Sequence, residues 1–334
     1  MKKLIRFTAF LLIAAVIFAG LDRLFTRKTL DGWWNITTKT HGFFNTEEDT
    51  LDVVFCGSSH AYASFNPLVI GEETGLSSYV IATQKQPLWA TYYYIKEAIE
   101  RQKPSLIVLD LFAFSLQDEY ADEATNYTFT DDFPFGRNKL EMIKHAAAPE
   151  DRFSLLFKFA KYHTRWSELT EDDFSYNPKE LRDYLYGYCM LTATSDDIVP
   201  NEIGNPIAIP SSEKNELWLI AIIDLCYENG TNLLLVKTPM NDTSEERGYF
   251  MRAAEIAEME AVPFISYNEL FDEIGLDFKT DFYDRAHLNW RGADKFSRYF
   301  AKTALADITP KAELNEEFMK NLERYKAEFD ELGG

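Results

Sequence analysis

The chain has 334 residues, of which 46% are hydrophobic and 15% aromatic, so it can bury a sizeable core and is not globally disordered. Its formal net charge of −20 argues against a nucleic-acid partner, because phosphate binding needs a basic face, and it disfavours binding to anionic lipid headgroups. Any attachment to a membrane must therefore be hydrophobic.

Residues 1–25 predict a signal-anchor helix. Lys2, Lys3 and Arg6 precede an apolar run over 7–21. A positive flank followed by a hydrophobic segment keeps the N-terminus inside and exports the rest of the chain. We therefore expect a single-pass anchor in the cell membrane with an extracytoplasmic domain. Cleavage after a small residue, which would release a secreted protein, is the open alternative.

Residues 26–50 indicate a juxtamembrane connector, and residues 51–310 predict an α/β domain. Short apolar strands alternate there with helices of about a dozen residues, the signature of a parallel sheet covered on both faces. The expected strands are 51–56, 78–82, 105–111, 231–236 and 262–266, and the expected helices are 66–75, 88–101, 216–227, 244–260 and 291–306. We expect a three-layer, doubly wound, flavodoxin-like fold with five parallel strands.

Two segments lie outside this alternation. Residues 113–215 are rich in aromatic and acidic side chains and predict an inserted, mostly helical cap, with one helix expected over 152–166. Residues 311–334 carry apolar side chains at helical spacing, which predicts an amphipathic helix that packs on its own domain.

The cysteines predict neither a disulfide framework nor a metal site. Cys56 and Cys226 lie in apolar runs and indicate small buried hydrophobes, and the third cysteine, Cys189, completes no redox or metal-binding spacing. No other cluster of histidine and acidic residues indicates a metal site, and nothing in the sequence indicates a cofactor.

Two short blocks indicate acyl chemistry on a serine. Gly57-Ser58-Ser59 follows the first expected strand, and Asp284 and His287 follow the last strand in a D-x-x-H block. Both blocks then lie at the carboxyl edge of the sheet, where open α/β sheets bind ligands. Histidine is the natural base for a serine hydroxyl, and a carboxylate orients the imidazole. The sequence therefore predicts Ser59, His287 and Asp284 as a catalytic triad.

These two blocks, in this order and context, resemble those of the SGNH/GDSL hydrolase superfamily. Its G-D-S block corresponds to Gly57-Ser58-Ser59, which makes Ser59 the nucleophile, and its D-x-x-H block corresponds to Asp284 and His287. With the anchor and the insert, the chain looks most like the DltD-like and polysaccharide-acetylating branches. The resemblance covers roughly residues 50–305.

The middle blocks of that superfamily are absent. Its second strand leads to a glycine and its third to an asparagine, and both donate hydrogen bonds to the oxyanion. Here the second strand leads to Thr83, Gln84 and Gln86, and the third to Asp110 without an asparagine. The backbone N–H of Ser59 is the expected donor, and Thr83, Gln84 and Gln86 are candidate substitutes or ordinary loop residues.

Histidines outside the triad are weaker candidates. His163 and Arg165, in the insert, could line an acceptor or anion pocket, with packing as the alternative. His60 adjoins the nucleophile, and its side chain is expected to point away from the site and serve a structural purpose. His41 and His145 have no supporting context.

The sequence and its resemblance imply an extracytoplasmic O-acyltransferase or esterase that works through an acyl-serine. The resemblance implies a cell-envelope or exported polysaccharide as substrate and a multi-pass membrane acyltransferase as partner. Transferase and hydrolase stay open because both use one acyl-enzyme and differ in whether water is excluded. The competing class is a non-catalytic SGNH-like accessory protein, which the missing glycine and asparagine favour.

Overall fold

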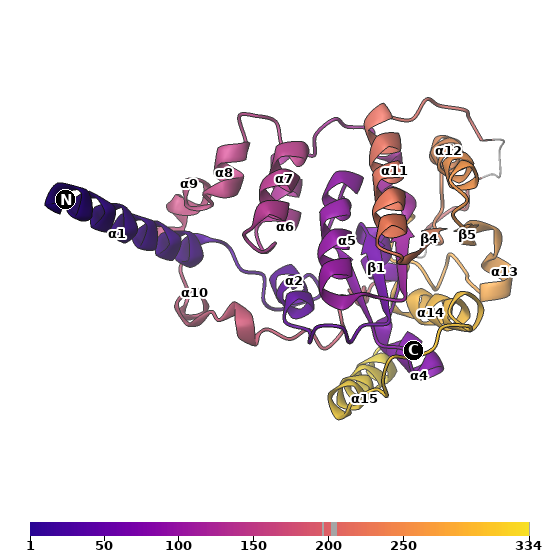
Figure 1. Ribbon diagram of the computed structural model, residues 1–334. Helices are drawn as coiled ribbons and strands as arrows, with labels where there is room; N and C mark the ends of the chain where they lie inside the picture. Colours follow the sequence, from indigo (N-terminus) through magenta and orange to yellow (C-terminus); the bar gives the residue numbers. More distant parts are fainter. Residues whose placement is uncertain (196, 202–205, 334) are drawn as a thin grey trace.

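The computed structural model describes residues 1–195, 197–201 and 206–333. A five-stranded, fully parallel sheet lies at its centre, with strand order β2-β1-β3-β4-β5 (Figure 1). The strands are β1 (Val53–Gly57), β2 (Ser78–Ala82), β3 (Leu106–Asp110), β4 (Asn232–Lys237) and β5 (Phe264–Ser266). The predicted doubly wound α/β fold is confirmed.

Helices cover both faces of the sheet because the strands alternate between two apolar cores. In β1, Val54 and Cys56 face one core, and Val53 and Phe55 face the other. The first core is closed by α5 (Leu88–Gln102), α11 (Glu213–Glu228) and α12 (Ser244–Met259). The second is closed by α3 (Ser59–Ser64), α4 (Pro67–Thr74), α13 (Phe271–Ile274) and α14 (Trp290–Ala304).

The short helix α4 shows how the sequence sets element boundaries. The side chain of Asn66 accepts hydrogen bonds from the backbone N–H groups of Leu68 and Val69, and Pro67 occupies the first helical position. Gly75 ends the helix in the left-handed conformation that favours glycine. These are the boundaries that the sequence predicts.

The connector contains a buried helix that the sequence does not predict. In α2 (Ile36–Phe44), every residue except His41 is buried. The hydroxyl of Tyr79 in β2 donates to the backbone oxygen of Lys39 at 2.8 Å, and the Lys39 ammonium pairs with the buried Asp183. This part of the connector therefore belongs to the core at the β2 edge of the sheet.

The insert is a string of short helices rather than one long one. They are η1 (Leu111–Ser115), α6 (Glu123–Thr130), α7 (Arg137–Ala146), α8 (Arg152–Leu156), α9 (Phe159–Tyr162), η2 (His163–Ser167), α10 (Glu171–Ser175) and η3 (Pro178–Glu180). The helix expected over 152–166 is interrupted at Phe157, whose backbone leaves the helical region at φ −119° and ψ 78°. The prediction of one continuous helix is therefore wrong.

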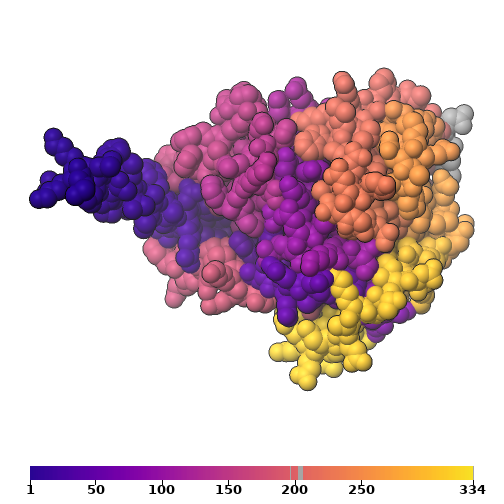
Figure 2. All heavy atoms as spheres, viewed as in Figure 1, coloured from indigo at the N-terminus to yellow at the C-terminus, as the bar shows by residue number. Residues whose placement is uncertain are grey.

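The two ends of the chain differ in their packing. The long helix α1 (Lys2–Phe25) has no buried residue and projects from the body (Figures 1 and 2). The C-terminal helix α15 (Glu316–Glu331) buries Phe318, Leu322 and Tyr325, and Phe318 lies against Gly71 of α4. The amphipathic C-terminal segment therefore packs on its own domain, as its spacing predicts.

Candidate active site

The turn after β1 holds Ser59 at the carboxyl edge of the sheet. Gly57 has φ +148°, a conformation that L side chains rarely adopt, and a Cβ atom there would lie 3.0 Å from Cβ of Asp110. Ser58 is extended and Ser59 is the first residue of α3. The sharp strand-to-helix turn therefore requires glycine, and it places the Ser59 hydroxyl above the strand.

The loop before α14 holds His287 and Asp284 in a locally determined geometry. Asp284 Oδ1 accepts hydrogen bonds from the backbone N–H groups of Ala286 at 2.8 Å and His287 at 2.9 Å. A single antiparallel bridge between Phe282 and Leu288 closes the loop. The D-x-x-H spacing thus forms an Asx turn that brings the carboxylate to the imidazole.

The structure brings the three predicted triad residues together. His287 Nε2 lies 2.8 Å from Ser59 Oγ, and His287 Nδ1 lies 2.9 Å from Asp284 Oδ1 and 3.0 Å from Oδ2. With Nδ1 protonated towards Asp284, Nε2 is the free base that faces the serine hydroxyl. This arrangement can deprotonate Ser59 as it attacks a carbonyl carbon.

The Asp284 carboxyl is ionised in this setting. Partial burial would raise its pKa, but the hydrogen bond and charge of His287, with the backbone N–H groups of Ala286 and His287, lower the pKa below its ordinary value. Asp284 therefore keeps the negative charge that stabilises a protonated imidazole. Its side chain is 46% exposed, so water also reaches this end of the triad.

Tyr62 also lies at the site, and it is not among the residues predicted from the sequence. It lies three residues after Ser59 on the same face of α3, and an interaction with the Ser59 side chain lowers the pKa of its phenol, against the larger effect of burial. Burial raises the pKa of the Tyr62 phenol, so this hydroxyl stays protonated and can donate. The i, i+3 spacing after a predicted nucleophile is the signal that could have identified it.

Asp110 supports the serine turn from the neighbouring strand. It lies at the end of β3, where the resembled superfamily leads into its asparagine, and is buried. It accepts hydrogen bonds from Phe112 N at 3.1 Å and from Thr238 N and Oγ1 at 3.2 and 2.9 Å. Burial raises the pKa of Asp110 to about 6, against these hydrogen bonds. Asp110 therefore ties β3 to β4 beneath the turn.

The candidate oxyanion donors after β2 have different environments. Thr83 is buried at the sheet edge, one residue past the Ala82 that pairs with Gly57, and its hydroxyl lies 3.4 Å from that of Thr128. Gln84 is exposed. Gln86 is buried and donates to Thr91 Oγ1 at 3.0 Å. Of the three, Thr83 lies in the register position nearest the serine turn.

The structure does not bring His163 and Arg165 to the triad. Arg165 Nη1 donates to the backbone oxygen of Phe25 at 2.6 Å, and its Nη2 lies 3.3 Å from Asp173. His163 is exposed, and its Nδ1 lies 2.8 Å from the backbone oxygen of Ala160. Both side chains belong to the junction between α1 and the insert, because α9 and η2 pack on the C-terminal turn of α1.

His60 packs beneath the site. Its ring stacks on Phe112 with 3.7 Å between centroids and lies 4.8 Å from the ring of His287. Burial and the neighbouring positive charges lower the pKa of His60 well below its ordinary value, so the ring is neutral. Its environment is that of a packed core side chain.

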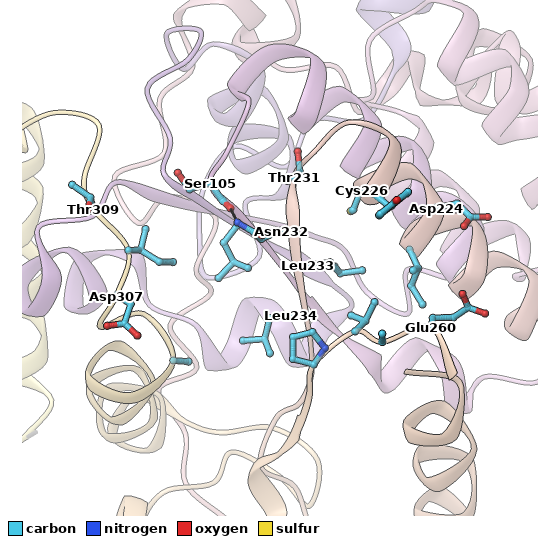
Figure 3. Close-up of a pocket in the computed structure, with 18 residues that line it drawn as sticks. Ser105, Asp224, Cys226, Thr231, Asn232, Leu233, Leu234, Glu260, Asp307 and Thr309 are labelled. Atoms are coloured by element: carbon cyan, nitrogen blue, oxygen red, sulfur yellow. Dashed lines mark hydrogen bonds between the residues drawn. The ribbon is translucent and has the colours of Figure 1, made fainter. Parts of the chain in front are cut away.

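Other candidate sites are distinct from the triad. Figure 3 shows a pocket at the amino ends of β3 and β4, lined by Ser105, Asn232 and Asp307, on the edge of the sheet opposite Ser59.

Within residues 1–195, 197–201 and 206–333, no group of three or more His, Cys, Asp or Glu side chains is arranged to hold a metal ion. All three cysteines are free thiols, and each is buried in one of the two cores.

Helix α1 is long and apolar enough to cross a membrane, with a mean hydropathy of 2.4 in its most apolar window. Near an N-terminus, a signal sequence has the same length and composition. The length and composition of α1 are therefore compatible with both a membrane anchor and a cleaved signal sequence.

No family model and no curated protein matches the chain. Among solved structures, it is similar to a candidate acylhydrolase from Bacteroides fragilis, with 11% identity over 80% of this chain and 96% of the other, at a TM-score of 0.41. It is also similar to a candidate GDSL-like lipase from Parabacteroides merdae, with 11% identity over 78% of this chain and 98% of the other, at a TM-score of 0.37. At this level of similarity the chemistry must be argued from the geometry of the triad.

Proposed function

We propose that this protein is an extracytoplasmic serine esterase or O-acyltransferase. The observation that carries the proposal is the continuous hydrogen-bonded path from Ser59 Oγ through the His287 ring to Asp284, at 2.8 and 2.9 Å. A nucleophile, a base and an orienting carboxylate within hydrogen-bonding distance form the arrangement that acyl transfer on serine requires.

The reaction has two halves. Ser59 Oγ attacks the carbonyl carbon of an acyl ester while His287 Nε2 accepts its proton, and the leaving alkoxide then takes that proton as the C–O bond breaks. In the second half, water or a sugar hydroxyl gives its proton to His287 and attacks the acyl-serine, which restores Ser59. Asp284 stabilises the imidazolium in both halves.

The oxyanion of each tetrahedral intermediate needs donors near Ser59. The Ser59 backbone N–H, at the first position of α3, is the first donor, and the protonated hydroxyl of Tyr62 is the second. Thr83, at the sheet edge beside the turn, is a third candidate. In this proposal Tyr62 and Thr83 replace the glycine and asparagine of the resembled superfamily.

The substrate class and location extend the proposal. The apolar, unburied α1 supports a single-pass membrane anchor, which favours a substrate fixed at the cell envelope. The acceptor that we propose is a hydroxyl of a cell-envelope or exported polysaccharide, with a multi-pass membrane acyltransferase as the acyl supplier. Support for the polysaccharide and for this partner comes from the resemblance of the two sequence blocks.

The test measures covalent labelling of Ser59 and turnover of an acyl ester. Full-length protein in detergent is incubated with a fluorescent fluorophosphonate, and p-nitrophenyl acetate hydrolysis is measured in parallel. Wild type should label and turn over, and Ser59→Ala should lose labelling and at least roughly 10⁴-fold in turnover. Ser58→Ala, which alters a neighbouring buried hydroxyl, is the matched control and should keep both. Equal labelling of wild type and Ser59→Ala would show that Ser59 is not the nucleophile, and no labelling in either would favour the non-catalytic accessory protein.

The carboxylate is tested separately. Asp284→Asn keeps the size of the side chain but favours the wrong imidazole tautomer, and we expect turnover to fall about 10³–10⁴-fold. Asp307→Asn, an exposed residue at the opposite edge of the sheet, is the control. Unchanged turnover in Asp284→Asn would show that another group orients His287.

A further inference from the structure

The C-terminal turn of α1 is fixed to the insert rather than joined to it by a flexible linker. Asp22 Oδ1 accepts a hydrogen bond from Phe159 N at 2.7 Å, and Arg165 Nη1 donates to the backbone oxygen of Phe25 at 2.6 Å. The rings of Phe25 and Phe159 pack edge to face, with 5.1 Å between centroids. The direction of α1 is therefore set by the folded domain.

Buried ion pairs also stabilise the junction between α1 and the insert. The Lys28 ammonium lies 2.9 Å from Asp173 Oδ1 and donates to the backbone oxygen of Leu24 at 2.8 Å, while Arg165 lies 3.3 Å from Asp173 Oδ2. The side chains of Lys28 and Asp173 are each 4% exposed. Ion pairs buried this deeply tolerate only one arrangement, because any other leaves a charge without its partner.

The length of the projecting part matches a bilayer. Residues 1–20 are almost entirely exposed, and burial begins at Leu21 and Asp22. Twenty helical residues rise about 30 Å, close to the thickness of the hydrocarbon core. The end of α1 far from the domain carries three basic residues, whose long side chains can reach the opposite headgroup layer: Lys2, Lys3 and Arg6. If residues 1–20 cross a membrane, the point where α1 enters the domain lies at the membrane–water interface.

Exposed aromatic side chains gather around this point. Residues 152–175, which comprise α8, α9, η2 and α10, are called the α1 collar below (Figures 1 and 2). In this segment α9, η2 and α10 contact the inner end of α1, and α8 packs on α9. The collar exposes Phe153, Phe157, Trp166 and Phe174 by 63, 50, 73 and 68%. Four large exposed aromatics in one short segment are costly in water, and aromatic belts of this kind are characteristic of membrane interfaces.

Charge distinguishes the collar from the rest of the molecule. The whole chain carries a net charge of −20, whereas residues 22–28 and 150–175 together contain seven basic and seven acidic residues. This region therefore carries no net charge and escapes the repulsion that anionic lipid headgroups exert on the remaining surface.

We infer that the α1 collar is a membrane-contact surface, in which Phe153, Phe157, Trp166 and Phe174 insert into the interfacial layer of the lipid bilayer around the base of α1. The inference rests on the proposed insertion of α1, and it adds a second attachment by the folded domain itself. Two attachments with a rigid junction hold the domain at a fixed height and tilt, so that the active-site edge keeps one orientation to the membrane.

The test places single fluorophores on the full-length protein in phosphatidylcholine vesicles that contain lipid carrying a nitroxide near its headgroup. Cys56, Cys189 and Cys226 are buried, so an introduced exposed cysteine is labelled selectively. Labels are placed at Trp166→Cys and Phe174→Cys in the collar, at Phe10→Cys in α1, and at Met259→Cys. Met259 is exposed at the end of α12, which lies at the opposite end of the molecule from α1 (Figure 1).

We expect blue-shifted emission and strong nitroxide quenching at Trp166→Cys and Phe174→Cys, and neither at Met259→Cys. If the Phe10→Cys label is in lipid but the collar labels behave like the Met259→Cys label, the collar does not contact the membrane, although the proposed anchor is supported. The exposed aromatic side chains would then be a surface for a protein partner. If Phe10→Cys itself is in water, α1 does not enter the bilayer, and the proposed anchor fails together with this inference.

Discussion

Ser59 and His287 lie 228 residues apart in the chain and meet at 2.8 Å. Each block can be identified locally, since one follows a buried strand and the other forms an Asx turn around its own histidine. Their contact follows from the parallel sheet, which brings the carboxyl ends of its strands to one edge. The packing of Tyr62 and Asp110 around this pair is given by the structure: Tyr62 follows Ser59 on α3, and Asp110 links β3 to the residue after β4.

The hydroxyl of Tyr62 offers a sharp test of the proposed oxyanion site. Tyr62→Phe removes the donor but keeps the ring, and we expect kcat for p-nitrophenyl acetate to fall about 10²–10³-fold with little change in KM. Tyr267→Phe, at another buried tyrosine, should leave both constants unchanged. Equal kcat in wild type and Tyr62→Phe would exclude Tyr62 as a donor.

Among the elements, the turn from β1 into α3 is the most constrained. Gly57 combines φ +148° with contacts that leave no space for a Cβ atom between Asp110 and Ala61. Glycine is therefore needed both for the backbone conformation and for the close approach of β3.

Gly57→Ala should destabilise the fold by about 1–3 kcal/mol and displace the Ser59 hydroxyl, because the new methyl group meets Asp110 at 3.0 Å. Chemical unfolding and fluorophosphonate labelling measure the two effects. Gly136→Ala is the control, since its backbone is extended at φ 174° and open space surrounds it. A Gly57→Ala protein as stable and reactive as Gly136→Ala would contradict this account.

Across the whole molecule, two buried carboxyls give stability a characteristic dependence on pH. Burial raises the pKa of Asp110 and of Asp131 to about 6 each, above the value of about 3.9 in an unfolded chain. Between these values the folded protein binds more protons than the unfolded one, so this contribution to stability is present at low pH and lost as pH rises through 6.

Two kinds of group act in the opposite direction. Carboxyls with lowered pKa values, such as Asp173 and Glu246, do so below about pH 4.5. His60 and His145, whose pKa values are lowered mainly by burial, do so already below about pH 6.5, because the unfolded chain then binds protons that the folded chain does not.

We therefore expect each of the two buried carboxyls to add roughly 1.3 kcal/mol to the free energy of unfolding as pH falls from 7 to 5, against the opposite contribution of the two histidines. Asp110→Asn with Asp131→Asn should remove this gain, so the stability of the double variant should fall relative to that of the wild type on acidification. Denaturant unfolding of the full chain in detergent, followed by tryptophan fluorescence at several pH values, measures it. A difference in unfolding free energy between wild type and the double variant that stays constant from pH 7 to pH 5 would contradict the assignment of these two groups.

The local sequence pattern was sufficient to predict the strands of the sheet, the helices that cover it and the Asp284–His287 turn. Each of these depends on backbone preferences and polar groups within a few residues. The selection of Ser59, which follows a buried strand at a glycine, also required the D-x-x-H block and the resemblance of both blocks to the superfamily. Where the structure departs from local pattern, the deciding partners are remote in sequence: α2 is buried against β2, and Arg165 binds the end of α1.

The same distinction explains the errors and omissions. Helical spacing over 152–166 suggested one helix, but the helix ends at Phe157: α8 before it packs on α6 and α7, and α9 after it packs on α1. Helical periodicity indicates which residues form an apolar face, but it does not indicate which other part of the chain packs against that face. Two short sequence blocks thus determined the chemistry that we propose, whereas the packing around Ser59 and the collar around α1 depended on contacts that only the folded chain creates.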